Sequence, residues 1–277
     1  MKLAMNIRNW GPTATPDFLR ACAEAADRSG LDAIWFNDHL GLPPALDDNP
    51  FGLQPEMGAI VDPLSFATFL AACTDRIAFG TGVLVLPYRP KILTSKWLAS
   101  IQILSKNRFL LGIGPGYLDE EFRALGVERS RRGRDTDDMI DFLRGCAESE
   151  LIEENGQSLR LSPKLQCPPI YVGGSPAVAI PRTVRCGDGW MPVAMSPDDL
   201  APHIRDLNQR AADAGRNVPD VVAMKTLPLA DRAAAVEMAQ GYREVGVTHL
   251  VHTQGYDSPS QYAEIVAQLD GEIRAAL

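Results

Sequence analysis

The stretch that decides the fold reads Pro169-Ile170-Tyr171-Val172-Gly173-Gly174-Ser175-Pro176-Ala177. Its first residues form a short apolar run that is typical of a buried strand, and a helical pattern follows from Ala177. Ser175 suits a helix N-cap and Pro176 suits the first helical position, so the strand passes into a helix within a few residues. The stretch is therefore one strand-to-helix unit of an α/β protein.

The same unit recurs along the whole chain. Short apolar runs predict eight strands, at residues 3–8, 31–37, 77–85, 108–113, 169–173, 189–193, 221–226 and 249–253. Helical periodicity follows each strand, near residues 16–30, 63–75, 91–105, 119–125 with 134–147, 177–186, 197–214, 231–244 and 259–276. Apolar runs without clean alternation are typical of parallel strands that helices cover.

Eight such units predict a single (β/α)8 TIM barrel over residues 1–277, an α/β fold. A long Pro-rich loop at about residues 40–62 follows the second strand, and an irregular insertion precedes the fifth. An open doubly wound sheet would show an early dinucleotide fingerprint, and Gly80-Thr81-Gly82 does not extend to one. On the helix near 91–105, one apolar stripe is predicted, made of Leu93, Trp97, Ile101 and Leu104.

Composition excludes several classes of protein. Hydrophobic residues make up 45% of the chain, which excludes disorder, and the net charge of −8 argues against nucleic-acid binding. The five cysteines include no Cys-x-x-Cys pair, so we expect buried thiols in a reducing compartment. No apolar run is long enough for a membrane span, and residues 1–8 do not resemble a signal peptide. We therefore expect a cytoplasmic protein without a membrane or nucleic-acid partner.

The chemistry is expected where the strands of such a barrel end. Two glycine clusters fall there. One is Gly112-x-Gly114-x-Gly116, and the other is the Gly173–Ala177 turn, whose helix start is an anion site. Each cluster is also explained by an ordinary bend or tight turn, but together they favour a flat, phosphate-bearing cofactor.

Polar side chains follow other strands at the same end. Asp38-His39 follows the second strand, where a histidine can move protons, although a structural pair at a strand end is equally consistent. Arg8 and Lys225 could hold an anionic substrate, or they could be solvated or structural charges. Asp119, Glu120 and Glu121 are interpreted as the negative first turn of a helix. No histidine pair has helical ligand spacing, so no metal site is expected.

Taken together, these motifs resemble the bacterial-luciferase-like superfamily of barrel flavin and deazaflavin oxidoreductases. The resemblance covers most of the chain in order, through residues 30–39, 62–64, 76–89, 108–117, 121–122, 169–176 and 187–190. The compact chain is most similar to the branch of probable enzymes of deazaflavin coenzyme F420.

The resemblance implies a cofactor ring over the barrel mouth and a phosphate near Gly173, Gly174, Ser175, Pro176 and Ala177. It implies that the Gly82-Val83 step, a cis peptide in deazaflavin members, lies against the ring. In this resemblance His39 is the proton donor or the substrate-polarising group.

The resemblance gives Asp38 a cofactor-contacting or orienting role. Tyr117 departs from the Trp or Glu of many relatives, so a carboxylate acid at that place is expected to be absent. Gly114, Gly116 and Tyr117 complete the predicted cofactor set.

The sequence thus predicts an F420-dependent oxidoreductase that transfers hydride to or from an unknown small organic substrate, with loop 40–62 as a lid. One alternative is an FMN-dependent monooxygenase that uses O₂ and a flavin reductase partner. Another is a non-catalytic flavin- or deazaflavin-binding protein. The resemblance also implies a homodimer, for which the helices near 63–75 and 91–105 are candidate surfaces.

Overall fold

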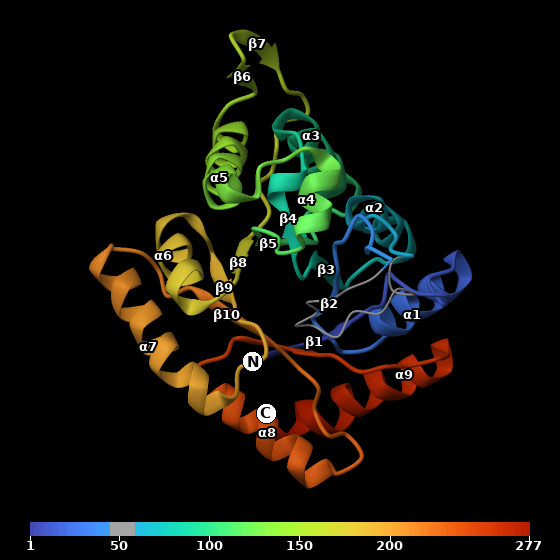
Figure 1. Cartoon of the computed structure of the whole chain (residues 1–277). Helices are drawn as coiled ribbons and strands as arrows, with labels where there is room; N and C mark the ends of the chain where they lie inside the picture. The colour runs from blue at the N-terminus through green and yellow to red at the C-terminus, as the bar shows by residue number, and fades with distance from the viewer. Residues whose placement is uncertain (45–58) are drawn as a thin grey trace.

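The computed structural model describes residues 1–44 and 59–277 and arranges them as a closed parallel barrel (Figure 1). The strands are β1 (Lys2–Asn6), β2 (Ala33–Phe36), β3 (Ala78–Thr81), β4 (Leu84–Val85), β5 (Phe109–Gly114), β8 (Ile170–Gly173), β9 (Gly189–Met191), β10 (Asp220–Lys225) and β11 (His249–His252). Each pairs in parallel with its neighbour, β3 and β4 share one position beside β5, and β11 pairs with β1. The predicted eight-stranded TIM barrel is confirmed.

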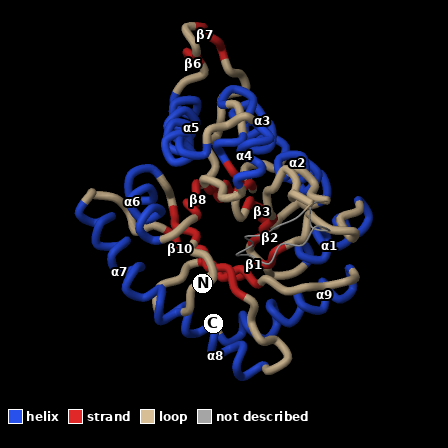
Figure 2. The backbone as a smooth tube through the Cα atoms, viewed as in Figure 1, coloured by secondary structure: helices blue, strands red, loops and turns tan. Residues whose placement is uncertain are grey.

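The helices surround the ring of strands on its outside (Figure 2). They are α1 (Pro16–Arg28), α2 (Pro63–Cys73), α3 (Lys91–Leu104), α4 (Asp119–Leu125), α5 (Arg132–Glu148), α6 (Pro176–Cys186), α7 (Pro197–Asp213), α8 (Arg232–Glu244) and α9 (Pro259–Gln268). Proline opens several of them because its missing N–H would have no partner in the first turn anyway. The predicted last helix is shorter than expected, since a π-helical turn (Leu269–Ile273) and a 3-10 turn (Arg274–Ala276) follow α9.

Two segments differ from the sequence prediction. The third strand is not continuous over 77–85, because the chain breaks its ladder between β3 and β4 at Gly82–Val83. The irregular insertion before β8 contains an antiparallel hairpin, β6 (Leu151–Glu154) and β7 (Gln157–Arg160), which projects away from the barrel in Figure 1. Asn155 and Gly156 both have positive φ in its turn, and Asn-Gly is the typical sequence signal for such a turn.

The core has two shells. Inside the barrel, small and aromatic side chains fill the lumen, namely Ala4, Ala33, Trp35, Tyr171, Met191, Val222 and Val251. A larger apolar layer lies between the strands and the helices. On α3 the residues of the predicted apolar stripe differ in burial: Ile101 is buried, whereas Leu93, Trp97 and Leu104 are 54%, 46% and 56% exposed.

The predicted lid at 40–62 falls mostly on residues 45–58, which lie outside the described residues. Among the described residues, no helix combines the length and apolarity needed to cross a membrane. All five cysteines lie in the described part of the chain and are free thiols. Burial raises the pKa of the Cys22 thiol to about 12, so this cysteine behaves as a small apolar residue.

Candidate active site

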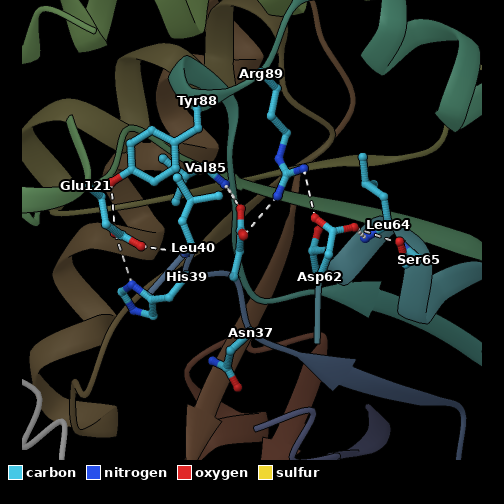
Figure 3. Close-up of polar contacts among 12 residues, drawn as sticks. Asn37, His39, Leu40, Asp62, Leu64, Ser65, Val85, Tyr88, Arg89 and Glu121 are labelled. Atoms are coloured by element: carbon cyan, nitrogen blue, oxygen red, sulfur yellow. Dashed lines mark hydrogen bonds and ion pairs between the residues drawn. The ribbon is translucent and has the colours of Figure 1, made fainter. Parts of the chain in front are cut away.

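Asp38 lies at the exit of β2 with a fully buried side chain. Its Oδ2 accepts a hydrogen bond from the Val85 N–H at 2.8 Å, and its Oδ1 accepts one from Arg89 Nη2 at 2.9 Å. Arg89 also reaches Asp62, whose carboxylate caps α2 (Figure 3). Burial raises the pKa of the Asp38 carboxyl, although Arg89 and the Val85 amide oppose this. The geometry supports an orienting role for Asp38, and direct cofactor contact stays a prediction.

The neighbouring residue Asn37 fixes the break between β3 and β4. Its Nδ2 donates to the Gly82 carbonyl oxygen at 3.3 Å, while the Gly82 N–H donates to Phe36 O at 2.7 Å. The Gly82–Val83 peptide bond is cis, as the family resemblance implies. The exit of β2 therefore determines where this peptide sits at the mouth of the barrel.

Gly114 and Gly173 give room to the Val83 side chain. A Cβ at Gly114 would lie 2.5 Å from Val83 Cγ2, and one at Gly173 would lie 2.8 Å from Val83 Cγ1. Gly116 has φ +77°, and a Cβ there would lie 2.8 Å from Val85 Cγ1. These glycines accommodate protein side chains, so their close approach to a ligand, which the sequence suggests, stays a prediction.

The turn between β8 and α6 keeps donors free at the barrel mouth. Gly174 has φ +131°, which favours glycine, and its carbonyl accepts a hydrogen bond from Trp190 Nε1 at 3.3 Å. Ser175 is the N-cap of α6, yet its hydroxyl makes no capping bond, and Pro176 follows at the start of the helix. Ser175 and Ala177 are exposed. The Ser175 hydroxyl and the Ala177 N–H at the start of α6 form a suitable cradle for an anion, since the Val178 and Ala179 N–H groups donate to Ser175 O.

His39 meets a buried carboxylate that the sequence analysis did not select. Its Nδ1 lies 3.1 Å from Glu121 Oε2 (Figure 3). The same oxygen accepts a hydrogen bond from the Tyr88 hydroxyl at 3.0 Å, and Oε1 accepts one from the Leu40 N–H at 2.6 Å. The Glu121 side chain is only 4% exposed, and that of His39 is 13% exposed. A histidine paired with a carboxylate can give or take a proton.

The charge of Glu121 is stabilised by these donors. Burial alone would raise the pKa of its carboxyl, but hydrogen bonds from His39, Leu40 and Tyr88, together with the His39 charge, lower that pKa below its usual value. Tyr117 completes the site, since its ring meets His39 edge to face with the centroids 5.7 Å apart. Burial and then Glu121 raise the pKa of Tyr117 to about 12, so its hydroxyl is protonated at neutral pH.

The expectation that this region lacks a carboxylate is wrong. Asp119 and Glu120 are solvent-accessible first-turn acids of α4, as predicted, but Glu121 turns inward. An α4 helix that starts at Asp119 places Glu121 and Phe122 on its buried side. The sequence did carry a signal, because Glu121-Phe122 belongs to the stretches that resemble the luciferase-like family.

The two predicted substrate residues occupy different surroundings. The Arg8 guanidinium lies 4.9 Å from the centre of the Trp10 ring and 5.2 Å from that of Tyr256. Its Nη1 donates to Tyr256 O at 3.3 Å, and no carboxylate of the described residues pairs with it. Lys225 lies at the end of β10, in register with His252 of β11, and no described contact joins it to Arg8.

Among the described residues, no three His, Cys, Asp or Glu side chains are grouped closely enough to hold a metal ion.

Comparison with known proteins identifies the family. The family model for luciferase-like monooxygenases matches residues 3–272, so the chain belongs to this family. An uncharacterized protein of Mycobacterium tuberculosis is 30% identical over 71% of this chain and 72% of its own. An F420-dependent hydroxymycolic acid dehydrogenase of the same organism is 30% identical over 66% of this chain and 51% of its own. The crystal structure of a monooxygenase from Streptomyces bottropensis covers 99% of both chains, with a TM-score of 0.81 and 16% identity.

Proposed function

We propose that this luciferase-like oxidoreductase uses coenzyme F420 and transfers hydride to or from a small organic substrate, with His39 handling the accompanying proton. The observation that carries the proposal is the His39–Glu121 pair at the barrel mouth, where enzymes of this fold place their chemistry. The coenzyme would supply the hydride chemistry when bound, and the protein supplies orientation and proton transfer.

The residues of the mouth fit a phosphate-bearing cofactor. The open Gly174 backbone and the uncapped Ser175 hydroxyl stand at the α6 N-terminus, where the helix dipole favours a negative group. The Val83 side chain, held between two glycine positions, is available to support a flat ring. Gly173, Gly174, Ser175 and Ala177 are thus the residues that would hold the phosphate end.

His39 is the group that handles the proton. Its Nδ1 faces Glu121, and its Nε2 has no hydrogen-bond partner in the described part of the chain. A substrate oxygen at Nε2 would receive a proton when a carbonyl is reduced, and would return it when an alcohol is oxidised. The Arg8 guanidinium lies near two aromatic rings and has no carboxylate partner among the described residues, so it would attract an anionic substrate group.

A name among the relatives favours F420 over FMN, since the hydroxymycolic acid dehydrogenase is described as F420-dependent. The family description, luciferase-like monooxygenase, is the reason to keep the alternative, which is a monooxygenase that would use FMN and a flavin reductase. A non-catalytic binding protein would keep the phosphate cradle but would not need the His39–Glu121 pair.

The first experiment is fluorescence titration of the cofactor-free protein with F420 and FMN side by side. Tight F420 binding with weak FMN binding is expected, and the reverse would favour the monooxygenase. His39→Gln separates the catalytic proposal from simple binding. It should leave the F420 affinity within about twofold and reduce turnover by roughly 10²–10⁴-fold. An unchanged rate would remove His39 from the mechanism.

We also propose that a second copy of the chain covers the exposed apolar residues of α3, which are Leu93, Trp97, Ile103 and Leu104. The expected species in light scattering is a dimer. Trp97→Glu should shift it toward the monomer, because a charge would be buried in the interface. A wild-type monomer would contradict this assignment.

A further inference from the structure

We propose that Glu121 is a positioning residue, which holds neutral His39 as the Nδ1–H tautomer and leaves Nε2 to accept and return the substrate proton. The catalytic consequence rests on the proposed function, whereas the tautomer is a property of the chain alone. In free neutral histidine no neighbouring group fixes which ring nitrogen carries the proton. In the protein, the residues around the ring have to select the tautomer.

Three hydrogen-bonding groups surround the Glu121 carboxylate. Leu40 N–H is a backbone donor and cannot reverse its role, so Oε1 of Glu121 must be an acceptor. The Tyr88 hydroxyl lies on Oε2, and burial together with Glu121 raises its own pKa, so it stays protonated. An ionised carboxylate only accepts, which leaves the third neighbour, Nδ1 of His39, as a donor.

The groups around the imidazole agree with this assignment. Glu121 is the acid that contacts His39 from α4, and Tyr88 approaches the same carboxylate from the segment after β4. Tyr117 presents its ring edge to face, and the Asp38 carboxylate is engaged by Arg89 and Val85. Within the described residues Nδ1 is therefore the bonded ring nitrogen, and Nε2 is the one left for substrate.

This geometry makes Glu121→Gln an informative variant. The Leu40 N–H would select the amide oxygen, so the amide NH₂ would face His39 Nδ1. An NH₂ group needs an acceptor, so the neutral ring would change to the Nε2–H tautomer. Replacement of the carboxylate by an amide would also remove the negative charge that stabilises the His39 imidazolium. Proton transfer at Nε2 would therefore be impaired in both directions.

The experiment is ¹⁵N NMR of the imidazole groups of the cofactor-free protein at pH 9, with the His39 signals assigned by their loss in His39→Gln. In the wild type, Nδ1 should give a protonated shift and Nε2 an unprotonated one, and Glu121→Gln should exchange them. Tyr88→Phe should retain the wild-type tautomer, because Glu121 stays ionised. Glu120→Gln is the matched control, since Glu120 belongs to the same turn but pairs with Arg123 at 3.0 Å. It should change nothing.

Kinetics with the loaded enzyme supply the second readout. Glu121→Gln should lower kcat/KM by about tenfold or more, mainly through kcat, while Glu120→Gln stays within twofold. A wild-type Nε2–H tautomer, or a tautomer unchanged in a folded Glu121→Gln, would overturn the positioning role. If the tautomers behave as expected but neither coenzyme binds, the proposed function fails and the assignment to Glu121 stands.

Discussion

Asp38 and Arg89 form an ion pair 2.9 Å long, with side chains 0% and 7% exposed. The pair joins the exit of β2 to the segment that leads into α3, and Asp38 also holds the Val85 amide. Because each charge was taken out of water, the loss of one partner is costly even where the intact pair adds little net stability. This relationship fixes the wall of the mouth that carries His39.

Arg89→Met should destabilise the protein by roughly 3–5 kcal/mol, because it leaves the Asp38 charge buried and unpaired. Urea unfolding followed by circular dichroism measures this change. Arg123→Met is the matched control, since Arg123 pairs with Glu120 on the surface and should cost at most about 1 kcal/mol. The double variant Asp38→Asn with Arg89→Met should recover part of the loss. Equal effects of the two Arg variants would contradict a buried, coupled pair.

Ser175→Asp should weaken coenzyme binding by about tenfold or more, because a carboxylate would occupy the proposed phosphate cradle. Stability should hardly change, since Asp is as good an N-cap as Ser. Ser258→Asp provides a close control, because Ser258-Pro259 also opens a helix, α9, after the last barrel strand. Titration of both variants with F420 and FMN decides between the two helix starts. Stronger loss in Ser258→Asp would move the phosphate to α9.

The barrel could be predicted from sequence because its signals are local. Each strand is a short apolar run, and prolines and glycines mark where helices begin and end, as at Ser175-Pro176 and Gly30. The hairpin at Asn155-Gly156 is not predicted although its turn signal is present, because its two strands are only four residues long each and mostly exposed. The outward direction of Trp97 could not be predicted, because periodicity defines a stripe without telling which neighbour covers it.

The site was only partly predictable for a related reason. The sequence marks His39 as a candidate and the Gly82–Val83 step, whose peptide bond is cis in the structure. The pairing of His39 with Glu121, however, joins residues 82 positions apart. Three acids in a row are normally a solvated first turn. Only the packing of Phe122 of α4 against Tyr88, together with the hydrogen bond from the Tyr88 hydroxyl to Glu121, shows that the third acid is buried. Likewise, Gly114 is required by the side chain of Val83, which lies about 30 residues earlier in the chain, at the break between β3 and β4.

Gly114→Ala should cost about 1–3 kcal/mol, because its Cβ would lie 2.5 Å from Val83 Cγ2 in a packed site. Val83→Ala removes that methyl group, so the double variant should be more stable than the sum of the two single changes predicts. Thermal and urea unfolding of the four proteins measure the coupling. Gly145→Ala is the control, because a Cβ at Gly145 would meet no atom within 4 Å and Gly145 has no positive φ. Gly126→Ala is unsuitable as a control, because Gly126 has φ +67°. Strict additivity would show that Val83 does not fill this space.

Stability should fall as the pH drops below 6.5, because of His249 at the start of β11, away from the barrel mouth. Burial lowers the pKa of His249 from 6.5 to about 4. The positive charges of Lys2 and the N-terminal amine add to this shift, and the negative charge of Asp220 opposes it. The unfolded chain therefore binds a proton below pH 6.5 that the folded chain does not take up until about pH 4. Stability is full above 6.5 and decreases through this window.

Between pH 7 and pH 5 this linkage amounts to about 2 kcal/mol, in a range where carboxylates such as Glu121, whose pKa is lowered, stay ionised. Urea unfolding at the two pH values measures it. His249→Gln, which cannot titrate, should lose the part of the difference that is due to His249, and buried His252, whose pKa is also lowered, should supply the remainder. The substitution should also leave coenzyme binding intact, because His249 packs beside Tyr171 below the site. If His249→Gln kept the full pH dependence, the proton would have to be taken up by another group.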